Sequence, residues 1–286
     1  METFFSFLER RVDDCSSLLC IGLDPHVNDL PAPTAASARD FCLNLIKQTA
    51  PYAAAFKPNA AFFEVFGAEG WTALREVIEA VEAESNRRGS LIPVILDAKR
   101  GDIASTAEAY AQAAFETLGA HCITLSPYLG KDSIEPFLQV PEKGVFLLCK
   151  TSNPGSGDLQ DLMVDGGQWT ADSSQSMVSG PRSMTLYEHV ARLAQAWNSR
   201  NNIGLVVGAT HVEALKRVRA AAPDLWFLAP GVGAQGGELE SALKAGLRRD
   251  AKGMLIPVSR SVARAEKPGL AAAELRDQIL EIKREM

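Results

Sequence analysis

The sequence predicts a parallel (β/α)8 TIM barrel of the α/β class, and two observations lead to this fold. Eight short, continuous apolar runs recur along the chain, and nearly every run is followed by an amphipathic, helix-like stretch. Eight strand–helix units within about 250 residues match a closed barrel better than an open, doubly wound sheet. We therefore expect a single domain over residues 1–286. A two-domain dinucleotide-binding fold is the alternative, but no G-x-G-x-x-G follows the first run.

The eight runs are rich in β-branched residues and are bounded by Gly, Pro or polar residues, which is typical of strands buried on both faces. They are Leu18–Leu23, Tyr52–Phe56, Leu91–Leu96, Cys122–Leu125, Val145–Cys149, Ile203–Val207, Leu225–Ala229 and Met254–Val258. Helical spacing appears in Trp71–Arg88, Ser183–Asn198, His211–Ala222, Glu238–Ala245 and Leu270–Glu285. Thr210 stands where the N-cap of one of these helices is expected.

One segment interrupts the alternation of strands and helices. Residues 153–182 carry Gly, Ser, Asp, Gln and Pro with little periodicity. At about 30 residues the segment is too long for an ordinary connection between a strand and a helix. We expect a loop insertion that acts as a lid or an interface at the active face. A disordered insertion without a role is the alternative.

The composition excludes several classes of protein. Hydrophobic residues make up 47% and charged residues 22%, as in globular proteins. The net charge of −6 does not indicate a general binding surface for nucleic acid or an anionic membrane. It still allows a local basic pocket that binds a small anion. No apolar run reaches the ~18 residues of a membrane span. The first residues are not typical of a secretory signal, so we expect a soluble, cytoplasmic protein with no nucleic-acid or membrane partner.

Cysteine and histidine usage predicts neither a disulfide framework nor a metal site. The cysteines are odd in number, scattered and without a C-x-x-C pair. The four histidines are widely spaced.

The densest group of charged residues is LDAKRGDI, residues 96–103. Asp97 and Lys99 are two apart, so on an extended strand both point to the same side, into the barrel mouth where active groups of this fold lie. Lys57, in AFKPNA, emerges from a neighbouring strand, and Asp102 follows at a loop–helix junction. This arrangement allows an alternation Lys–Asp–Lys–Asp. In the alternative interpretations, Asp97 and Lys99 form a structural ion pair and Asp102 is a helix N-cap.

The alternation has a chemical consequence. A lysine between two carboxylates has a raised pKa, so it is a poor Schiff-base nucleophile. Its ammonium group also occupies the position between Asp97 and Asp102 where a divalent cation would bind, which argues against a metal site. What remains is proton donation beside a fixed negative charge, where Asp97 destabilises an anionic substrate group and Lys99 stabilises negative charge that develops nearby. Decarboxylation followed by protonation of the carbanion meets both requirements.

A second group of residues predicts an anion site. The segment PGVGAQGGELE, residues 230–240, is a glycine-rich loop that enters a helix, and Arg260 follows the eighth strand in PVSRS. Backbone N–H groups at a helix N-terminus and a guanidinium together bind anions. The loops after strands seven and eight of such barrels frequently hold phosphate. In the alternative interpretation, the glycines only form tight turns and Arg260 pairs with a surface acid.

Taken together, FKPN, LDAKRGDI, TSNPG, APGVGAQGG and SRS resemble the orotidine 5'-phosphate decarboxylases, in particular their bacterial type 2 branch. The resemblance extends from GLDP at residues 22–25 to SRS at 259–261. It implies conversion of orotidine 5'-phosphate to UMP and carbon dioxide in pyrimidine biosynthesis. It also implies a homodimer that uses neither a metal nor an organic cofactor.

The resemblance assigns roles to the charged residues. Lys99 matches the proton donor to C6 of the pyrimidine, and Asp97 matches the carboxylate placed against the substrate carboxylate. Lys57 matches the lysine that completes the charge network and contacts the ribose. Asp102, with Thr106 one helical turn on, matches residues that the family contributes to the neighbouring subunit's site. We therefore expect active sites shared across the dimer.

The remaining matches concern substrate binding. Asp24 matches a contact to a ribose hydroxyl, and Ser152 matches the serine that hydrogen-bonds the pyrimidine amide edge. Gln235 and Arg260 match the phosphate contacts. Two other functions stay open: a phosphate-sugar lyase that holds Mg²⁺ on a similar Asp-x-Lys-x-x-Asp cluster, and a catalytically silent barrel that binds nucleotide. Sensitivity to a chelator distinguishes the first, and nucleotide binding without turnover distinguishes the second.

Overall fold

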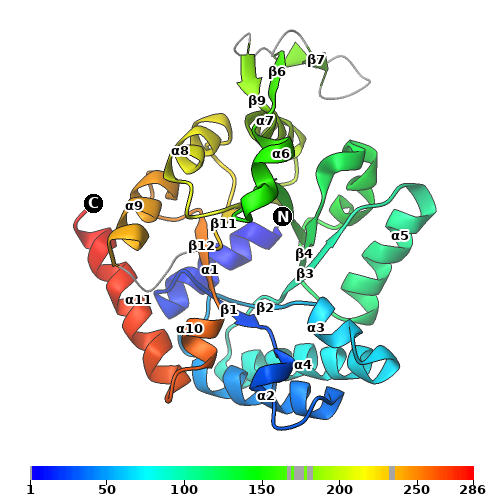
Figure 1. The fold of residues 1–286 in the computed structure, drawn as a ribbon, viewed down its shortest axis with the longest axis vertical. Coiled ribbons are helices and arrows are strands. Elements are labelled where there is room, and N and C mark those ends of the chain that lie inside the picture. Colours follow the sequence, from blue (N-terminus) through cyan, green and yellow to red (C-terminus); the bar gives the residue numbers. More distant parts are fainter. Residues whose placement is uncertain (1, 166–168, 171–176, 179–182, 232–235) are drawn as a thin grey trace.

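The computed structural model describes residues 2–165, 169–170, 177–178, 183–231 and 236–286 (Figure 1). Within these residues, eight parallel strands form the barrel in the order β2-β1-β12-β11-β10-β5-β4-β3. Their bounds are β1 Leu19–Leu23, β2 Ala55–Pro58, β3 Ile95–Arg100, β4 Cys122–Leu125, β5 Gly144–Lys150, β10 Ile203–Val207, β11 Phe227–Leu228 and β12 Met254–Val258. The predicted (β/α)8 fold is confirmed.

The barrel closes between β2 and β3, the two ends of that strand order. Single parallel bridges join Phe56 to Val94 and Asn59 to Asp97. The backbone N–H of Phe56 also donates to the carbonyl of Pro93 at 3.0 Å. These contacts bring the carboxyl ends of β2 and β3 together, so side chains that follow the two strands share one corner of the barrel mouth.

Three of the eight predicted strands, β4, β10 and β12, have the predicted bounds. Each is an apolar run whose residues are nearly all buried, because helices cover the outside and side chains fill the inside. The observed β2 and β3 begin later and extend past the apolar runs to Pro58 and Arg100. Backbone pairing explains the extension: Pro58 pairs with Leu23 of β1, and Arg100 pairs with Leu125 of β4.

Helices surround the barrel (Figure 1). The α-helices are α1 Phe4–Cys15, α2 Ala35–Thr49, α3 Ala61–Glu64, α4 Gly67–Arg88, α5 Ala104–Gln112, α6 Gly157–Gln160, α7 Leu186–Trp197, α8 Val212–Ala221, α9 Gly236–Gly246, α10 Arg260–Ala263 and α11 Pro268–Arg284. Short 3-10 turns lie at Val27–Asp29, Pro127–Leu129, Lys131–Ser133, Glu135–Leu138 and Pro154–Ser156, and a π turn lies at Ala113–Thr117. Across the described ranges, none of the helices has both the length and the apolar character needed to span a bilayer.

The predicted helices are all present with shifted starts, and the starts of α8 and α7 differ for identifiable reasons. The N-cap of α8 is His211 rather than Thr210, and the cap makes no side-chain hydrogen bond. Residues Ser183–Thr185, predicted to begin a helix, form strand β9, which pairs with β6, Met163–Asp165. The antiparallel ladder satisfies the backbone groups of β9, so α7 begins only after Thr185.

The insertion contains regular structure in its described part. After Ser152 the chain forms a 3-10 turn and α6, and then β6, which pairs antiparallel with β9. Two further short strands, β7 Trp169–Thr170 and β8 Met177–Val178, pair with each other. Figure 1 shows β6, β7 and β9 projecting beyond the ring of helices. A role for this insertion as a lid or an interface stays a prediction.

Helix α1, which the sequence analysis did not predict, covers the N-terminal end of the barrel. Its aromatic residues are buried, and the Phe5 ring stacks on the Trp226 ring with centroids 6.2 Å apart and packs edge-on against Phe146. The signal in the sequence is the helical spacing of Phe4, Phe5 and Leu8. Burial of several large aromatic side chains makes this helix part of the core.

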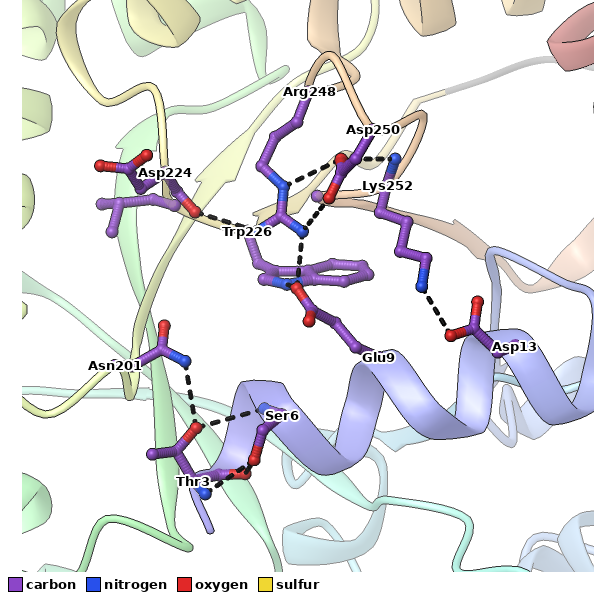
Figure 2. Close-up of polar contacts among 12 residues, drawn as sticks. Thr3, Ser6, Glu9, Asp13, Asn201, Asp224, Trp226, Arg248, Asp250 and Lys252 are labelled. Atoms are coloured by element: carbon purple, nitrogen blue, oxygen red, sulfur yellow. Dashed lines mark hydrogen bonds and ion pairs between the residues drawn. The ribbon is translucent and has the colours of Figure 1, made fainter. Parts of the chain in front are cut away.

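Polar contacts hold the other face of α1 (Figure 2). The Glu9 carboxylate accepts from the indole N–H of Trp226 at 3.2 Å and from the Arg248 guanidinium at 2.6 Å. Lys252 pairs with Asp13 at 2.6 Å, one turn farther along α1. With α1 fixed beneath the strands, this end of the barrel is closed, and the opposite end carries the candidate site.

Candidate active site

Three predicted residues meet at the carboxyl ends of β2 and β3. The Lys57 ammonium donates to Oδ2 of Asp97 at 2.7 Å, and the Lys99 ammonium donates to Oδ1 of the same carboxylate at 2.5 Å. Lys57 and Asp97 are buried, whereas the Lys99 side chain is 51% exposed. The structure therefore brings together three members of the predicted Lys–Asp–Lys–Asp alternation, with Asp97 at their centre, but not the fourth, Asp102.

A residue that the sequence analysis missed completes this group. The Thr124 hydroxyl, on β4, donates to Oδ1 of Asp97 at 3.0 Å. The Thr124 hydroxyl oxygen in turn accepts from the backbone N–H groups of Ala98 and Lys99 at 3.1 and 3.0 Å. Thr124 lies in a short buried run, and nothing in its spacing identified it as a partner of Asp97.

The backbone at Lys99 corrects one step of the prediction. We expected an extended chain from Asp97 to Lys99, but Lys99 has a φ of +48°, in the left-handed region. A left-handed residue with a side chain costs about 1–2 kcal/mol. The hydrogen bond from its N–H to Thr124 and the ion pair to Asp97 hold Lys99 in this conformation. Both side chains still line the cavity at the barrel mouth, but the backbone between them is not extended as predicted.

The charges in this group determine each other's pKa. Burial alone raises the pKa of Asp97, but the positive charges of Lys57 and Lys99 outweigh this effect and lower it to about 2. Burial alone lowers the pKa of Lys57, but the negative charges of Asp97 and Asp24 raise it above its ordinary value. At neutral pH, Asp97 is therefore a fixed carboxylate and Lys57 a fixed ammonium.

These residues line a cavity of about 520 Å³ at the mouth of the barrel, a size suited to a small molecule. Its polar lining comes from β2, β3, β4 and the segment after β5, and its apolar lining comes from β5 and the opposite strands β10 to β12. The polar residues are Lys57, Asp97, Lys99, Thr124, Thr151, Ser152, Asn153 and Gln160, and the apolar ones are Leu148, Val206, Leu228, Pro230 and Pro257. The cavity therefore has one polar, charged wall and one largely apolar wall.

Ser152 lies at the rim of this cavity, two residues after β5, and is exposed. The N–H of Gly208 donates to the carbonyl of Lys150 at 2.7 Å, which ties the ends of β5 and β10 together. A Cβ at Gly208 would lie 3.0 Å from the Cβ of Ser152, closer than side chains normally approach. Glycine at this position therefore leaves room for Ser152 beside the cavity.

Asp24 and Arg260 follow the neighbouring strands β1 and β12. Among the described residues, the buried Oδ1 of Asp24 has no hydrogen-bond donor, so this acceptor is unused in the structure. Arg260 is the first residue of α10 and is exposed. Gln235, the other predicted phosphate contact, lies outside the described residues.

Asp102 and Thr106 do not join the charged group of their own chain. Oδ1 of Asp102 accepts from the N–H of Ile103 at 2.9 Å. Helix α5 begins at Ala104 with Ile103 at its N-cap, so the interpretation of Asp102 as the helix cap is wrong. The chain turns sharply here, with Ala104 at a φ of +50°, and this turn displaces the helix start. Thr106 is exposed on α5.

The donor set does not suit a metal ion. In the part of the chain that the structure describes, no three His, Cys, Asp or Glu residues are grouped as ligands. Both oxygens of Asp97 already accept hydrogen bonds from ammonium groups. The five cysteines are free and buried.

Comparison with known proteins identifies the family. The model of the orotidine 5'-phosphate decarboxylase / HUMPS family matches residues 17–275. The chain belongs to this family. It is 45% identical over 287 residues to the orotidine 5'-phosphate decarboxylase of Roseiflexus castenholzii, covering 96% of this chain and 97% of the relative. The resemblance inferred from the sequence motifs is confirmed.

Solved structures agree with this assignment. The chain is similar to Leishmania donovani OMP decarboxylase, with a TM-score of 0.83, 54% identity and 99% of both chains covered. It is also similar to a structure named as a putative orotidine-monophosphate decarboxylase from Toxoplasma gondii, with a TM-score of 0.87 and 43% identity, covering 99% of this chain and 97% of that one.

The buried ion pair predicts a pH-dependent loss of stability in Asp97→Asn. At pH 7 the substitution leaves the Lys57 charge without its partner, which lowers the free energy of unfolding by about 3–5 kcal/mol. The depressed pKa of Asp97 stabilises the fold above the ordinary value of 3.8, and this contribution is lost as the pH falls toward about 2. Urea denaturation at a series of pH values measures the difference between the two proteins.

Asp277→Asn is the matched control, because Asp277 forms an exposed ion pair with its neighbour Arg276. Exposed pairs contribute little, so this variant denatures like wild type at every pH. A destabilisation of Asp97→Asn that stays constant from pH 7 to well below pH 3.8 would contradict the assigned charge state.

Proposed function

We propose that this chain decarboxylates orotidine 5'-phosphate to UMP and carbon dioxide in de novo pyrimidine biosynthesis. The observation that carries the proposal is the Asp97 carboxylate fixed between two ammonium groups in the wall of a cavity of substrate size. The relatives named as orotidine 5'-phosphate decarboxylases support it.

In this proposal, each charged group has a part in the reaction. The substrate carboxylate binds against Asp97, where repulsion between the two anions favours its departure. The bond between C6 and the carboxylate breaks, carbon dioxide leaves, and the electron pair remains on C6. The Lys99 ammonium stabilises this carbanion and then gives it a proton. Lys57 keeps Asp97 ionised and contacts the ribose.

Binding of the pyrimidine, ribose and phosphate holds the substrate carboxylate next to Asp97, despite the repulsion between the two anions. In this proposal Ser152 hydrogen-bonds the amide edge of the pyrimidine, and Oδ1 of Asp24 accepts from a ribose hydroxyl. Gln235 and Arg260 bind the phosphate. Contacts far from the reacting bond thus supply free energy that accelerates the chemical step.

We propose that the reaction needs neither a metal nor an organic cofactor. The alternative, a phosphate-sugar lyase with Mg²⁺, requires Asp97 to bind the cation, but ammonium groups already contact both of its oxygens. Substrate and product are small, charged and water-soluble. The reaction therefore fits a cytoplasmic enzyme with no nucleic-acid or membrane partner.

We further propose a homodimer in which Asp102 and Thr106 complete the neighbouring subunit's site. Asp102 contacts neither lysine of its own chain in the described structure. The apolar side chains nearby are exposed: Ile103 by 52% and Tyr128 by 77%. The segments that carry them lie side by side, since the N–H of Ser126 donates to the carbonyl of Arg100 at 2.7 Å. Apolar surface of this kind is typical of a protein interface.

The proposed reaction is tested with purified protein, orotidine 5'-phosphate and EDTA. Wild type converts the substrate to UMP at a rate that EDTA does not change. Lys99→Ala lowers kcat by at least about 10²–10⁴, the usual contribution of a general acid, and retains most of its affinity for UMP. Activity that depends on added Mg²⁺ and a phosphorylated keto-sugar would instead support the lyase. Near-normal turnover by Lys99→Ala would show that another group is the acid.

Shared sites are tested by mixing two inactive variants, Lys99→Ala and Asp102→Ala. Random exchange of subunits makes half of the dimers mixed, and each mixed dimer has one intact site. The mixture therefore recovers up to about a quarter of the wild-type activity. Native mass spectrometry verifies that the subunits have exchanged. If exchange occurs without recovery of activity, Asp102 does not act in the partner's site.

A further inference from the structure

The first part of the insertion folds back onto the site. After Ser152 the chain passes through the 3-10 turn Pro154–Ser156 into α6, whose last residue, Gln160, lines the cavity. None of the motifs recognised in the sequence includes Gln160. Its position next to the proposed pyrimidine contact makes its own hydrogen bonds informative.

Those hydrogen bonds hold Thr151, the residue that precedes Ser152. Oε1 of Gln160 accepts from the backbone N–H of Thr151 at 2.9 Å. Nε2 of Gln160 donates to the Thr151 hydroxyl at 2.9 Å, and this hydroxyl donates to Oδ1 of Asn153 at 2.7 Å. One glutamine side chain thus fixes both the backbone and the side chain of Thr151.

Lys150 and Asp161, the chain neighbours of Thr151 and Gln160, form a second link between the end of β5 and α6. Lys150 precedes Thr151, and its ammonium donates to Oδ1 of Asp161, the residue after Gln160, at 2.8 Å. The Lys150 side chain is only 5% exposed, and it also donates to Oγ of Ser156 at 3.2 Å. This ion pair of the buried lysine anchors α6 to the end of β5. The two links close a small loop that contains Ser152.

We propose that Gln160 is a positioning residue, which holds Ser152 in the conformation that recognises the pyrimidine ring. The proposal rests on the function proposed above for Ser152. A loop held in place before the ligand arrives loses less conformational entropy on binding, so its hydrogen bond to the base contributes more affinity. Because the phosphate and ribose contacts lie on other strands, Gln160 affects recognition of the base alone.

The test compares two ligands, UMP and ribose 5-phosphate, which lacks the base. Gln160→Leu removes the hydrogen bonds to Thr151, and we expect it to weaken UMP binding about tenfold. Its affinity for ribose 5-phosphate stays within about twofold of wild type, since that ligand does not reach Ser152. In turnover assays the KM for orotidine 5'-phosphate rises while kcat changes little. Isothermal titration and competition assays on the full-length protein measure these constants.

Two variants separate positioning from a general structural role. Gln160→Glu keeps the oxygen that accepts from Thr151 but loses the amide donor, so it recovers part of the affinity for UMP. Asp158→Asn, an exposed position on the same helix, binds both ligands like wild type. Equal weakening of both ligands in Gln160→Leu, or no weakening of either, would overturn the inference.

Ser152→Ala separates failure of this inference from failure of the proposed site. If Ser152→Ala weakens UMP binding selectively and Gln160→Leu does not, the role of Ser152 stands and that of Gln160 is wrong. If Ser152→Ala leaves UMP binding intact, both roles are wrong. Decarboxylation by the wild-type protein is measured independently of either result.

Discussion

The site depends on a single carboxylate that is held between two ammonium groups. Removing Asp97 and Lys57 from water is costly, and isolated buried charges are not stable. Here each charge meets its opposite at hydrogen-bonding distance, and Thr124 adds a further donor to Asp97. The result is a permanent negative charge, ionised at any pH above about 2, that the fold places in the cavity wall.

The remainder of the barrel keeps this arrangement rigid. The Asn59–Asp97 bridge sets the distance between the strands that carry the two charged residues. At the opposite end, α1 fills the floor with aromatic side chains and forms polar contacts around its rim (Figure 2). Electrostatic catalysis requires charges that do not reorient during the reaction, and a closed barrel with one open end provides such a frame.

The sequence predicts the barrel and the charged group well because both depend on local patterns. Continuous apolar runs mark the strands, and residues that follow neighbouring strands meet at the same end of the barrel. The errors have other causes. Helix starts depend on the conformation of single residues. This applies to α8, which is capped by His211 rather than Thr210, and to α5, which begins two residues after Asp102. The hydrogen bonds of Thr124 and Gln160 join segments that no spacing rule connects. The helical spacing of α1 is visible in the sequence, but its place beneath the barrel is a tertiary feature.

The central claim is that Asp97 destabilises the carboxylate of the bound substrate, and the most direct test compares affinities for substrate and product. Lys99→Ala prevents turnover, so dissociation constants for orotidine 5'-phosphate and UMP can be measured in this background, with and without the further substitution Asp97→Asn. We predict that Asp97→Asn shifts the ratio of the two constants by about tenfold or more in favour of orotidine 5'-phosphate, because repulsion of its carboxylate is removed. An unchanged ratio would contradict the account.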